Sequence, residues 1–334
     1  MHQKKAALFY DYPLEDGAVF GSGRRERLAE LSDLHPHVIN AGNFDVHAPE
    51  LADLEVIFAS WGMPNLTDEQ LGRLPKLAAV FYAAGNVKAF AQQLVDHDIV
   101  LVSAWAINAI PVAEMCLAQI LLSLRGYFRS VRRYRELRDT TAAKRFIRPG
   151  VAGETIGLIG MGHIGTRLRH LLRDYPLEVI AHDPMLTTAR AAELGVEHVD
   201  LAELFSRSFI VSNHIPDLPS TRATLGAALF AAMREGATFI NTGRGAQVVE
   251  ADLITVLKDR VDLTALLDVT WPEPPADESE LWTLPNVVIS PHIGGTIGNE
   301  VTRLADCAIE EFEAWNAGRP LRYQVTGEVL RTMG

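Results

Sequence analysis

A glycine-rich turn constrains the fold of this chain more than any other feature of its sequence. The turn, residues 160–165 with the sequence G-M-G-H-I-G, follows an apolar run at residues 155–159 and opens a segment with leucines at helical spacing. A G-x-G-x-x-G turn between a strand and a helix is typical of a dinucleotide-binding site. Gly160 permits the tight turn, Gly162 lets the backbone approach a pyrophosphate, and Gly165 lets the helix pack close to the sheet. The helix N-terminus would present its N–H groups and positive dipole to the phosphates.

An acidic residue, Asp183, follows the next apolar run, 18 residues after Gly165. A carboxylate at this distance accepts hydrogen bonds from the adenosine ribose hydroxyls and repels a 2′-phosphate. Residues 181–189 contain no Lys or Arg that would bind such a phosphate. The sequence therefore predicts NAD as the cofactor, in preference to NADP.

Short apolar runs alternate with helical patterns along most of the chain, which predicts an α/β fold with parallel sheets. Six candidate strands in the second half match the count of a doubly wound, Rossmann-type sheet. They lie at residues 155–159, 178–182, 209–213, 238–241, 264–268 and 287–290. A smaller series of four lies at residues 6–11, 55–61, 77–84 and 99–103. Because 334 residues exceed the size of a single core, we expect two domains.

The helical patterns are clear enough to place several helices. The longest covers residues 108–138, with Asn108 as its N-cap, and the polar residues 140–150 after it predict a loop. Thr67 opens a T-D-E-Q capping box, and an amphipathic pattern at residues 298–315 predicts a last helix.

Charge and cysteine content limit the partners and the compartment. The formal net charge is −11, and an acidic surface repels phosphate backbones and anionic lipid heads, so we expect neither nucleic acid nor membrane as a partner. Cys116 and Cys307 form neither a disulfide framework nor a metal-ligand spacing, so we expect no metal and a reducing compartment. The N-terminus lacks the apolar run of a signal peptide, and residues 104–124 contain the polar residues of a buried helix rather than a membrane span. These features indicate a cytoplasmic protein.

One segment departs from the acidic average. Between Arg125 and Arg148 there are nine Lys or Arg and two Asp or Glu. The basic residues at 125, 129, 132 and 133 recur at helical spacing and share one face. Two interpretations stay open: a solvated helix face, or an arm that meets an acidic partner subunit.

Three charged side chains follow separate strands, at the sheet edge where open α/β sheets bind ligands. His292 can donate the proton that a developing alkoxide requires, because an imidazole side chain ordinarily exchanges a proton near neutral pH. Glu273 can accept a hydrogen bond from the imidazole and hold its tautomer, and the planar guanidinium of Arg244 suits a substrate carboxylate or carbonyl oxygen. This set fits the reduction of a 2-keto acid.

These motifs together make the sequence similar to the D-isomer-specific 2-hydroxyacid dehydrogenases, the family that includes D-3-phosphoglycerate dehydrogenases and glyoxylate/hydroxypyruvate reductases. The resemblance covers nearly the whole chain. It rests on Asn108 with Val112-Ala113-Glu114, the G-M-G-H-I-G turn, Pro216 with Thr221, the Arg244 segment, Asp268 with Glu273-Pro274, and the segment S-P-H-I-G-G that begins at Ser290. It implies a catalytic triad of Arg244, Glu273 and His292.

The resemblance also implies a cofactor site and a split architecture. The cofactor-binding candidates are Gly160, Gly162, His163, Ile164, Gly165, Asp183, His214, Pro216, Thr221, Thr242, Gly243, Arg244, Asp268, His292 and Gly294. A flavodoxin-like substrate domain would comprise residues 1–105 and 299–334. The NAD-binding domain would be inserted at residues 106–298, with a long helix and basic arm at 109–148, and would form a homodimer.

The segments expected to bind substrate depart from the family pattern. The substrate loop carries Ala84, Gly85 and Asn86 without the acid that usually follows, and Trp61 stands where many members have an Arg-Ser-like pair. The candidate substrate-binding residues are Trp61, Ala84, Gly85, Asn86, Arg244 and His292. A missing arginine would weaken recognition of a second anionic group, so we expect that 3-phosphoglycerate is not the substrate. Lys88 could replace that charge or be a solvated lysine, and Phe146 could reach a partner's active site or anchor its own loop.

The sequence thus predicts an NAD-dependent oxidoreductase acting on a D-2-hydroxy acid or its 2-keto acid. Within the family we do not expect a formate dehydrogenase, because that branch has Gln where this chain has Glu273. The alternative from another class is an NAD(H)-sensing regulatory or corepressor-like protein of the same fold, which would keep the triad. Such a protein would require a recruitment surface and disordered extensions, and the sequence has neither. The sequence leaves the substrate and the physiological direction open.

Overall fold

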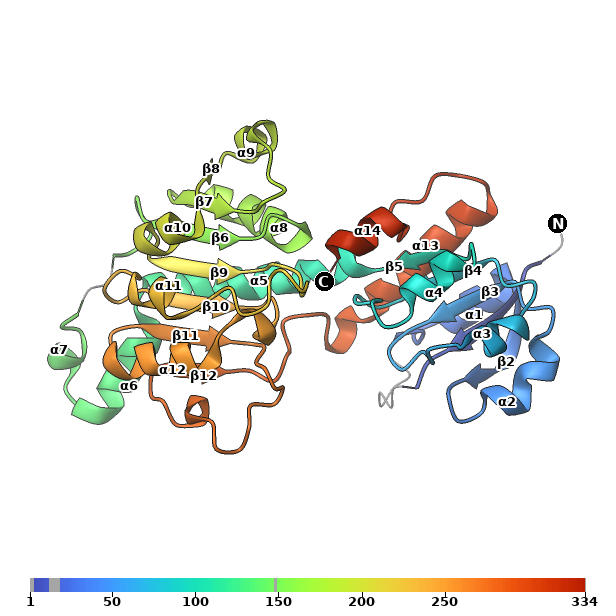
Figure 1. The fold of residues 1–334 in the computed structure, drawn as a ribbon, viewed down its shortest axis with the longest axis horizontal. Helices are drawn as coiled ribbons and strands as arrows, with labels where there is room; N and C mark the ends of the chain where they lie inside the picture. The colour runs from blue at the N-terminus through green and yellow to red at the C-terminus, as the bar shows by residue number, and fades with distance from the viewer. Residues whose placement is uncertain (1–2, 12–18, 147–148, 334) are drawn as a thin grey trace. The chain divides into compact units, whose positions relative to one another are not determined.

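The computed structural model describes residues 3–11, 19–146 and 149–333, and the chain divides into two compact units (Figure 1). Unit 1 comprises Met1–Asn108 and Thr296–Gly334, and unit 2 comprises Ala109–Gly295. Within the described residues, each unit is built on one sheet of parallel strands with helices on both faces. The predicted α/β fold with a doubly wound parallel sheet and a second, smaller sheet is confirmed.

Unit 1 contains a five-stranded parallel sheet in the order β2-β1-β3-β4-β5. The strands are β1 (Lys5–Phe9), β2 (Asp33–Ile39), β3 (Val56–Ala59), β4 (Ala79–Tyr82) and β5 (Val100–Ser103). The helices are α1 (Arg24–Leu31), α2 (Phe44–His47), η1 (Ala48–Leu51), α3 (Asp68–Gly72), α4 (Ala91–Asp96), η5 (Gly298–Glu300), α13 (Thr302–Asn316) and α14 (Gly327–Thr332). This strand order is that of flavodoxin-like sheets, whose ligands bind where the order reverses, beyond β1 and β3.

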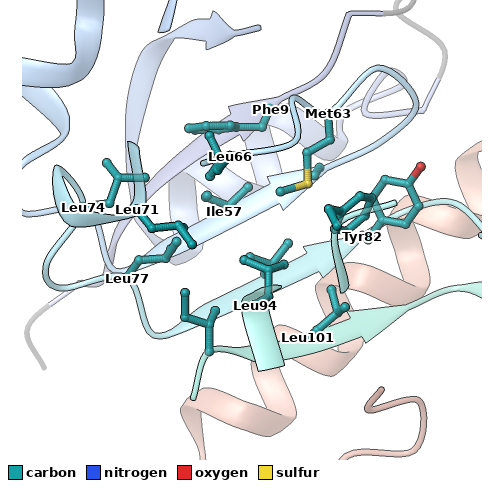
Figure 2. Close-up of a cluster of buried hydrophobic side chains, with 14 of the residues drawn as sticks. Phe9, Ile57, Met63, Leu66, Leu71, Leu74, Leu77, Tyr82, Leu94 and Leu101 are labelled. Atoms are coloured by element: carbon teal, nitrogen blue, oxygen red, sulfur yellow. The ribbon is translucent and has the colours of Figure 1, made fainter. Parts of the chain in front are cut away.

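The two faces of this sheet bury separate apolar clusters, because successive strand residues point to opposite faces. One face, with Phe9, Ile57 and Leu101, packs against α2, η1, α3 and α4 (Figure 2). The other, with Phe58 and Phe81, packs against α1 and α13. The Thr67 capping box that opens α3 is present as predicted, with reciprocal hydrogen bonds to Gln70.

Unit 2 contains a seven-stranded parallel sheet in the order β12-β11-β10-β9-β6-β7-β8. The strands are β6 (Thr155–Ile159), β7 (Glu178–His182), β8 (Glu197–His198), β9 (Ile210–Asn213), β10 (Thr238–Asn241), β11 (Thr264–Leu267) and β12 (Val287–Ile289). The helices are α5 (Trp105–Leu124, entering from unit 1), α6 (Tyr127–Leu137), α7 (Thr140–Ala143), α8 (His163–Leu171), η2 (Leu172–Asp174), α9 (Thr188–Leu194), α10 (Leu201–Arg207), α11 (Ala227–Ala231), η3 (Gly245–Gln247), α12 (Glu250–Asp259) and η4 (Glu280–Trp282). The order reverses between β6 and β9, which is where a doubly wound sheet binds its ligand.

Helices cover both faces of this sheet as well. Helices α5, α8 and α9 pack on the face that carries Ile156 and Leu158, and α10, α11 and α12 pack on the face that carries Val211 and Phe239. Among the described residues, α5 is the one helix long and apolar enough to cross a membrane. Part of that helix, including Cys116, is buried in the core of unit 2.

The single helix expected over residues 108–138 is two helices in the structure. Gly126 between α5 and α6 has φ 65°, a left-handed conformation that glycine adopts without strain and that ends the first helix. Helix α5 begins at Trp105, so Asn108 is not its N-cap. Its Oδ1 instead accepts hydrogen bonds from the backbone N–H and the hydroxyl of Thr296, at 2.9 and 2.8 Å. The amphipathic pattern continues across the break, and this made the prediction wrong.

Two strands and one helix in the structure fall where the sequence predicted none. Strand β2 contains Pro36 and little apolar surface, and its register against β1 shifts, because Ala6 pairs with Leu34 while Leu8 pairs with Val38. Two extra residues of β2 therefore bulge at this edge of the sheet. Strand β8 has two residues, so unit 2 has seven strands rather than six. The expected loop after α6 contains the short helix α7.

We predict that Phe312→Ala destabilises unit 1. The Phe312 ring is 1% exposed and makes edge contacts with Phe58 and Phe81, at centroid distances of 5.0 and 5.6 Å. Truncating a buried aromatic side chain lowers the free energy of unfolding by about 3–5 kcal/mol, because it removes apolar contacts and leaves a cavity. Chemical denaturation followed by circular dichroism would measure this change in the free energy of unfolding. Val46→Ala, at a side chain that is 73% exposed, should change stability by less than about 0.5 kcal/mol. Equal effects of the two changes would contradict this account of the core.

Candidate active site

The glycine turn between β6 and α8 has three glycines in three different situations. Gly160 has φ 90°, and a Cβ there would lie 3.0 Å from the backbone of His214. A Cβ at Gly165 would lie 2.0 Å from the carbonyl oxygen of Gly160, so only glycine lets α8 start this close to the turn. A Cβ at Gly162 would meet no atom within 4 Å. The open side of the turn is therefore at Gly162, where a ligand phosphate can approach the backbone.

The first turn of α8 carries the other two candidates of this segment. Within the described residues, no side chain caps the N-terminus of α8. Burial lowers the pKa of His163, and Ile164 packs against the core of unit 2. A helix N-terminus without a side-chain cap, beside open space, fits the pyrophosphate of a dinucleotide.

Asp183 follows β7, next to the glycine turn. Its Oδ2 accepts a hydrogen bond from the backbone N–H of Met161 at 2.7 Å, and its Oδ1 accepts one from that of Met185 at 2.8 Å. These bonds fix the carboxylate beside the turn, and each oxygen keeps a second lone pair for a further donor. The position and charge of this carboxylate fit a ribose diol.

His214 and Thr242 follow the neighbouring strands β9 and β10. The Nδ1 of His214 lies 3.0 Å from the Thr242 hydroxyl oxygen, and burial lowers the pKa of His214 to about 3, so the ring is neutral. Its Nε2 is buried and has no hydrogen-bond partner among the described residues. A buried polar atom without a partner costs free energy. This nitrogen can therefore form a hydrogen bond with a polar group of a ligand.

The loop after β9 is fixed by side chains on both sides. The Thr221 hydroxyl donates to the Pro216 carbonyl at 2.7 Å. The amide of Gln247 donates to the carbonyls of Ile215 and Pro216, at 2.7 and 2.9 Å, while its Oε1 accepts from Asn213 at 2.6 Å. Gln247 and Asn213 could not be identified from the sequence, because an amide within an apolar segment gives no signal until its partners are known.

Arg244 lies directly after this network, at the start of η3. Its backbone N–H donates to Gln247, and its Nη1 donates to the Gly243 carbonyl at 2.7 Å. Burial lowers the pKa of Arg244, while the charges of Asp217 and Glu273 act in the opposite direction. A guanidinium stays a cation in proteins, so this is a partly buried positive charge near two carboxylates.

The segments that carry Arg244 and Glu273 are in close backbone contact. A Cβ at Gly245 would lie 1.9 Å from the backbone of Thr270, so no other residue fits between the two loops. The Thr270 N–H lies 3.4 Å from Glu273 Oε2. Glu273 Oε1 lies 2.6 Å from Nδ1 of His292, and both side chains are partly exposed, at 40% and 48%. The structure thus brings Glu273 and His292 into direct contact, with the Arg244 segment beside them.

Asp268 holds the loop that presents His292. Its Oδ1 accepts hydrogen bonds from the Ser290 hydroxyl at 2.6 Å and the Ile293 N–H at 2.9 Å, and its Oδ2 accepts one from the Gly294 N–H at 2.8 Å. A Cβ at Gly294 would lie 2.8 Å from the same Oδ2, so glycine is required there. Asp268 is a cofactor-binding candidate from the sequence, and its role in holding this loop was not predicted.

The candidate substrate residues of unit 1 follow strands β3 and β4. The Ser103 hydroxyl lies 2.9 Å from the Ala84 carbonyl and 2.7 Å from that of Gly85, and Asn86 Oδ1 accepts from the Lys88 N–H at 2.9 Å. Trp61, after β3, is partly buried against the cores on both faces of the sheet. These residues lie at the carboxyl edge of the flavodoxin-like sheet, where ligands of such sheets bind.

Part of the basic segment, residues 125–148, contacts other residues of unit 2. The Arg129 guanidinium lies over the Phe146 ring at 4.6 Å, and Arg132 donates to the Val261 carbonyl at 2.9 Å. Burial lowers the pKa of both arginines. Arg148, the last residue of the segment, lies outside the described residues.

The chain is similar to known proteins along much of its length. Residues 117–294 match the family model of the D-isomer specific 2-hydroxyacid dehydrogenase, NAD binding domain. A D-3-phosphoglycerate dehydrogenase of Archaeoglobus fulgidus is 30% identical over 259 residues, 74% of this chain and 49% of that protein. D-3-phosphoglycerate dehydrogenase 1 of Saccharomyces cerevisiae is 36% identical over 203 residues, 57% of this chain and 42% of that protein. This chain spans about half the length of these relatives.

Solved structures share the fold at lower identity. A phosphoglycerate oxidoreductase from Rhizobium etli superposes with a TM-score of 0.80 at 22% identity, covering 98% of this chain and 100% of that one. The D-mandelate dehydrogenase of Rhodotorula graminis, in its apo form, gives a TM-score of 0.77 at 22% identity, with 97% of both chains covered. The family match covers more than half of the chain and contains the glycine turn, Asp268 and His292. The chain therefore belongs to the D-isomer specific 2-hydroxyacid dehydrogenase family.

Proposed function

We propose that this protein is an NAD(H)-dependent oxidoreductase that interconverts a D-2-hydroxy acid and its 2-keto acid. The observation that carries the proposal is the contact of 2.6 Å between His292 Nδ1 and Glu273 Oε1, beside Arg244 at the carboxyl edge of a dinucleotide-type sheet. Bound NAD(H) would exchange a hydride with the carbon that carries the oxygen. The side chains then have two tasks, namely to move one proton and to hold an anionic substrate.

His292 is the proposed acid and base. Its Nδ1 faces Glu273, so its Nε2 is the nitrogen that would donate a proton to the carbonyl oxygen during reduction and accept it during oxidation. Glu273 would accept a hydrogen bond from Nδ1–H, which fixes this tautomer and stabilises the imidazolium form. Asp268 would contribute by holding the loop, since it binds three donors of that loop.

Arg244 is the proposed anchor for the substrate carboxylate or carbonyl oxygen. Its fork of N–H donors matches a carboxylate in two parallel hydrogen bonds, and partial burial strengthens that attraction. Trp61, Ala84, Gly85 and Asn86 would recognise the rest of the substrate. Because Trp61 replaces a cation, we propose that the substrate is a 2-keto acid other than 3-phosphohydroxypyruvate, although the relatives named above are D-3-phosphoglycerate dehydrogenases.

NAD is the proposed cofactor in preference to NADP. The Asp183 carboxylate, fixed by Met161 and Met185, would accept bonds from the ribose hydroxyls and repel a 2′-phosphate. His163, Ile164, His214, Pro216, Thr221, Thr242, Gly243 and Gly294 would line the rest of the cofactor site. We propose that the protein works in the cytoplasm as a homodimer formed by the NAD-binding domain, with a small-molecule substrate and with neither nucleic acid nor membrane as a partner.

The proposed activity predicts the outcome of a substrate screen. NADH should be oxidised in the presence of at least one 2-keto acid among glyoxylate, hydroxypyruvate, phenylpyruvate, branched 2-keto acids and oxaloacetate, and faster than NADPH. A spectrophotometric assay of the purified protein measures both rates. If no acid supports oxidation of either cofactor, the enzyme proposal is wrong and the regulatory alternative is favoured. Selective, efficient reduction of 3-phosphohydroxypyruvate would contradict the substrate argument alone.

We predict that His292→Ala lowers kcat by about 10²–10⁴-fold, the usual contribution of a positioned acid or base, with little change in the Kd for NADH. Glu273→Gln should cause a smaller loss, because the amide keeps an acceptor but removes the charge that stabilises the imidazolium. His198→Ala is the matched control, because His198 is an exposed histidine of unit 2 on the edge strand β8. Wild-type kcat in His292→Ala would exclude His292 as the acid and base.

We predict that Asp183→Asn shifts the cofactor preference toward NADPH. The amide keeps an oxygen acceptor for the Met161 N–H but removes the negative charge that would repel a 2′-phosphate. The ratio of the Kd values for NADPH and NADH should fall about tenfold, equivalent to about 1.4 kcal/mol. Fluorescence titration with each cofactor measures the ratio. Asp200→Asn, at the N-cap of α10, is the control and should leave the ratio unchanged. An unchanged ratio in Asp183→Asn would remove the charge argument.

A further inference from the structure

Two neighbouring segments of unit 1, β2 and α2–η1, bring three histidines and a glutamate together. His35 and His37 flank Pro36 in the bulge of β2, His47 ends α2, and Glu50 lies in η1. The ring centroids of the three histidines lie 4.8 to 5.7 Å apart. Strand β2 is an edge strand, and β1 and β3 separate it from the strand that precedes the Gly85 loop. This cluster therefore lies apart from the candidate substrate residues of unit 1.

The donor atoms are arranged around a common point. His35 Nε2 lies 3.0 Å from Glu50 Oε2, and His47 Nδ1 lies 3.4 Å from the same oxygen. One donor atom from each of the three residues lies within 4.8 Å of the other two. Ligands at 2.0–2.1 Å from a tetrahedral Zn²⁺ are about 3.3 Å apart. The distances of 3.0 and 3.4 Å to Glu50 Oε2 are close to this separation, so the three atoms are spaced as ligands of one ion.

The surroundings orient the rings as metal ligands require. His35 Nδ1 lies 3.2 Å from the His37 carbonyl oxygen and 3.3 Å from the His37 backbone nitrogen, so it can donate to the first or accept from the second. In the tautomer that accepts from His37, Nε2–H donates to Glu50; in the tautomer that donates to the carbonyl, the Nε2 lone pair is available to a metal ion. Metal-binding histidines commonly make this second hydrogen bond. The His37 ring stacks on His47 at an interplanar angle of 29°. The side chains of His35 and His47 are only 12% and 17% exposed, so both rings are held in place.

We propose that His35, His47 and Glu50 form a binding site for a divalent transition-metal ion of the Zn²⁺ class, with water completing the coordination. Two imidazoles and a carboxylate are the donor types that such ions prefer, and the carboxylate supplies negative charge. The ion would join the bulged edge strand β2 to the α2–η1 segment and so stabilise unit 1. The site is independent of the proposed dehydrogenase activity. It also departs from our expectation of no metal, which rested on the cysteines.

The test is a Zn²⁺ titration of the untagged full chain after treatment with a chelator, measured by calorimetry. The wild-type protein should bind one ion at this site, and His35→Ala, His47→Ala and Glu50→Gln should each weaken binding at least about tenfold. His97→Ala is the matched control, because its Nε2 lies 2.9 Å from Asp68 in an exposed histidine–carboxylate pair of the same unit. His97→Ala should bind Zn²⁺ as the wild-type protein does.

Two further readouts separate binding from folding. Co²⁺ should give visible d–d absorption in the wild-type protein and in His97→Ala, and lose it in His47→Ala. Zn²⁺ should raise the Tm of the first two proteins and leave that of His47→Ala unchanged, since only binding to the folded state stabilises it. Glu50→Gln removes one charge and no ring, so it reports on binding even if a histidine variant fails to fold. If the wild-type protein binds no Zn²⁺ saturably, or if Glu50→Gln binds it equally well, the cluster is a set of hydrogen bonds only and the proposal is wrong.

Discussion

The buried carboxylate of Asp268 holds together the part of unit 2 in which the candidate catalytic residues meet. This side chain is 3% exposed, and a charge with so little solvent requires hydrogen-bond donors. Ser290, Ile293 and Gly294 supply three of them, all from the loop that follows β12. In the loop conformation that supplies these donors, His292 has φ 55° and its Nδ1 faces Glu273. The position of the proposed acid and base is thus a consequence of solvating a neighbouring carboxylate.

Glycines set the distances between the loops around this carboxylate. Gly245 lets the Arg244 segment lie against Thr270, Gly294 lets its loop close over Asp268, and Gly165 lets α8 begin against the glycine turn. In each case an added Cβ would lie less than 3.0 Å from another atom. Parallel strands bring their carboxyl ends to one edge of a sheet, but they leave the loops free to separate. The absence of side chains at these three positions is what lets the loops pack into one site.

The polar groups at the sheet edges have different hydrogen-bond partners in the two units. In unit 2, Gln247 and Asp268 form hydrogen bonds with backbone groups of neighbouring loops, and these bonds restrict the conformations of the loops. In unit 1, Ser103 fixes the carbonyls of the Gly85 loop, and the histidine cluster lies at the far edge, on a strand that is bulged and paired on one side only. An edge strand with a proline at its centre has lost part of its ladder. A ligand that joins β2 to η1 would compensate for that loss.

The sequence predicted the features that depend on local order along the chain. It predicted the alternation of strands and helices, the glycine turn with its three distinct glycines, the Thr67 capping box, and the strand ends that carry Arg244, Glu273 and His292. Predictions from local sequence pattern were wrong where the structure depends on the backbone conformation of a single residue or on a partner distant in the sequence. Gly126 ends a helix whose amphipathic pattern continues, Asn108 binds Thr296 instead of capping α5, and the polar strand β2 forms because β1 is beside it.

The polar groups that contact one another depend on the tertiary structure. The roles of Gln247 and Asp268, and the gathering of His35, His47 and Glu50, depend on loops that are close in space because strands pair across the sheet. Hydrogen bonds and ligand geometry require distances of a few ångströms between residues separated by many positions, and no periodicity in a sequence records such a distance. The chemistry of each residue was therefore visible from the sequence, whereas the partner that orients it was not.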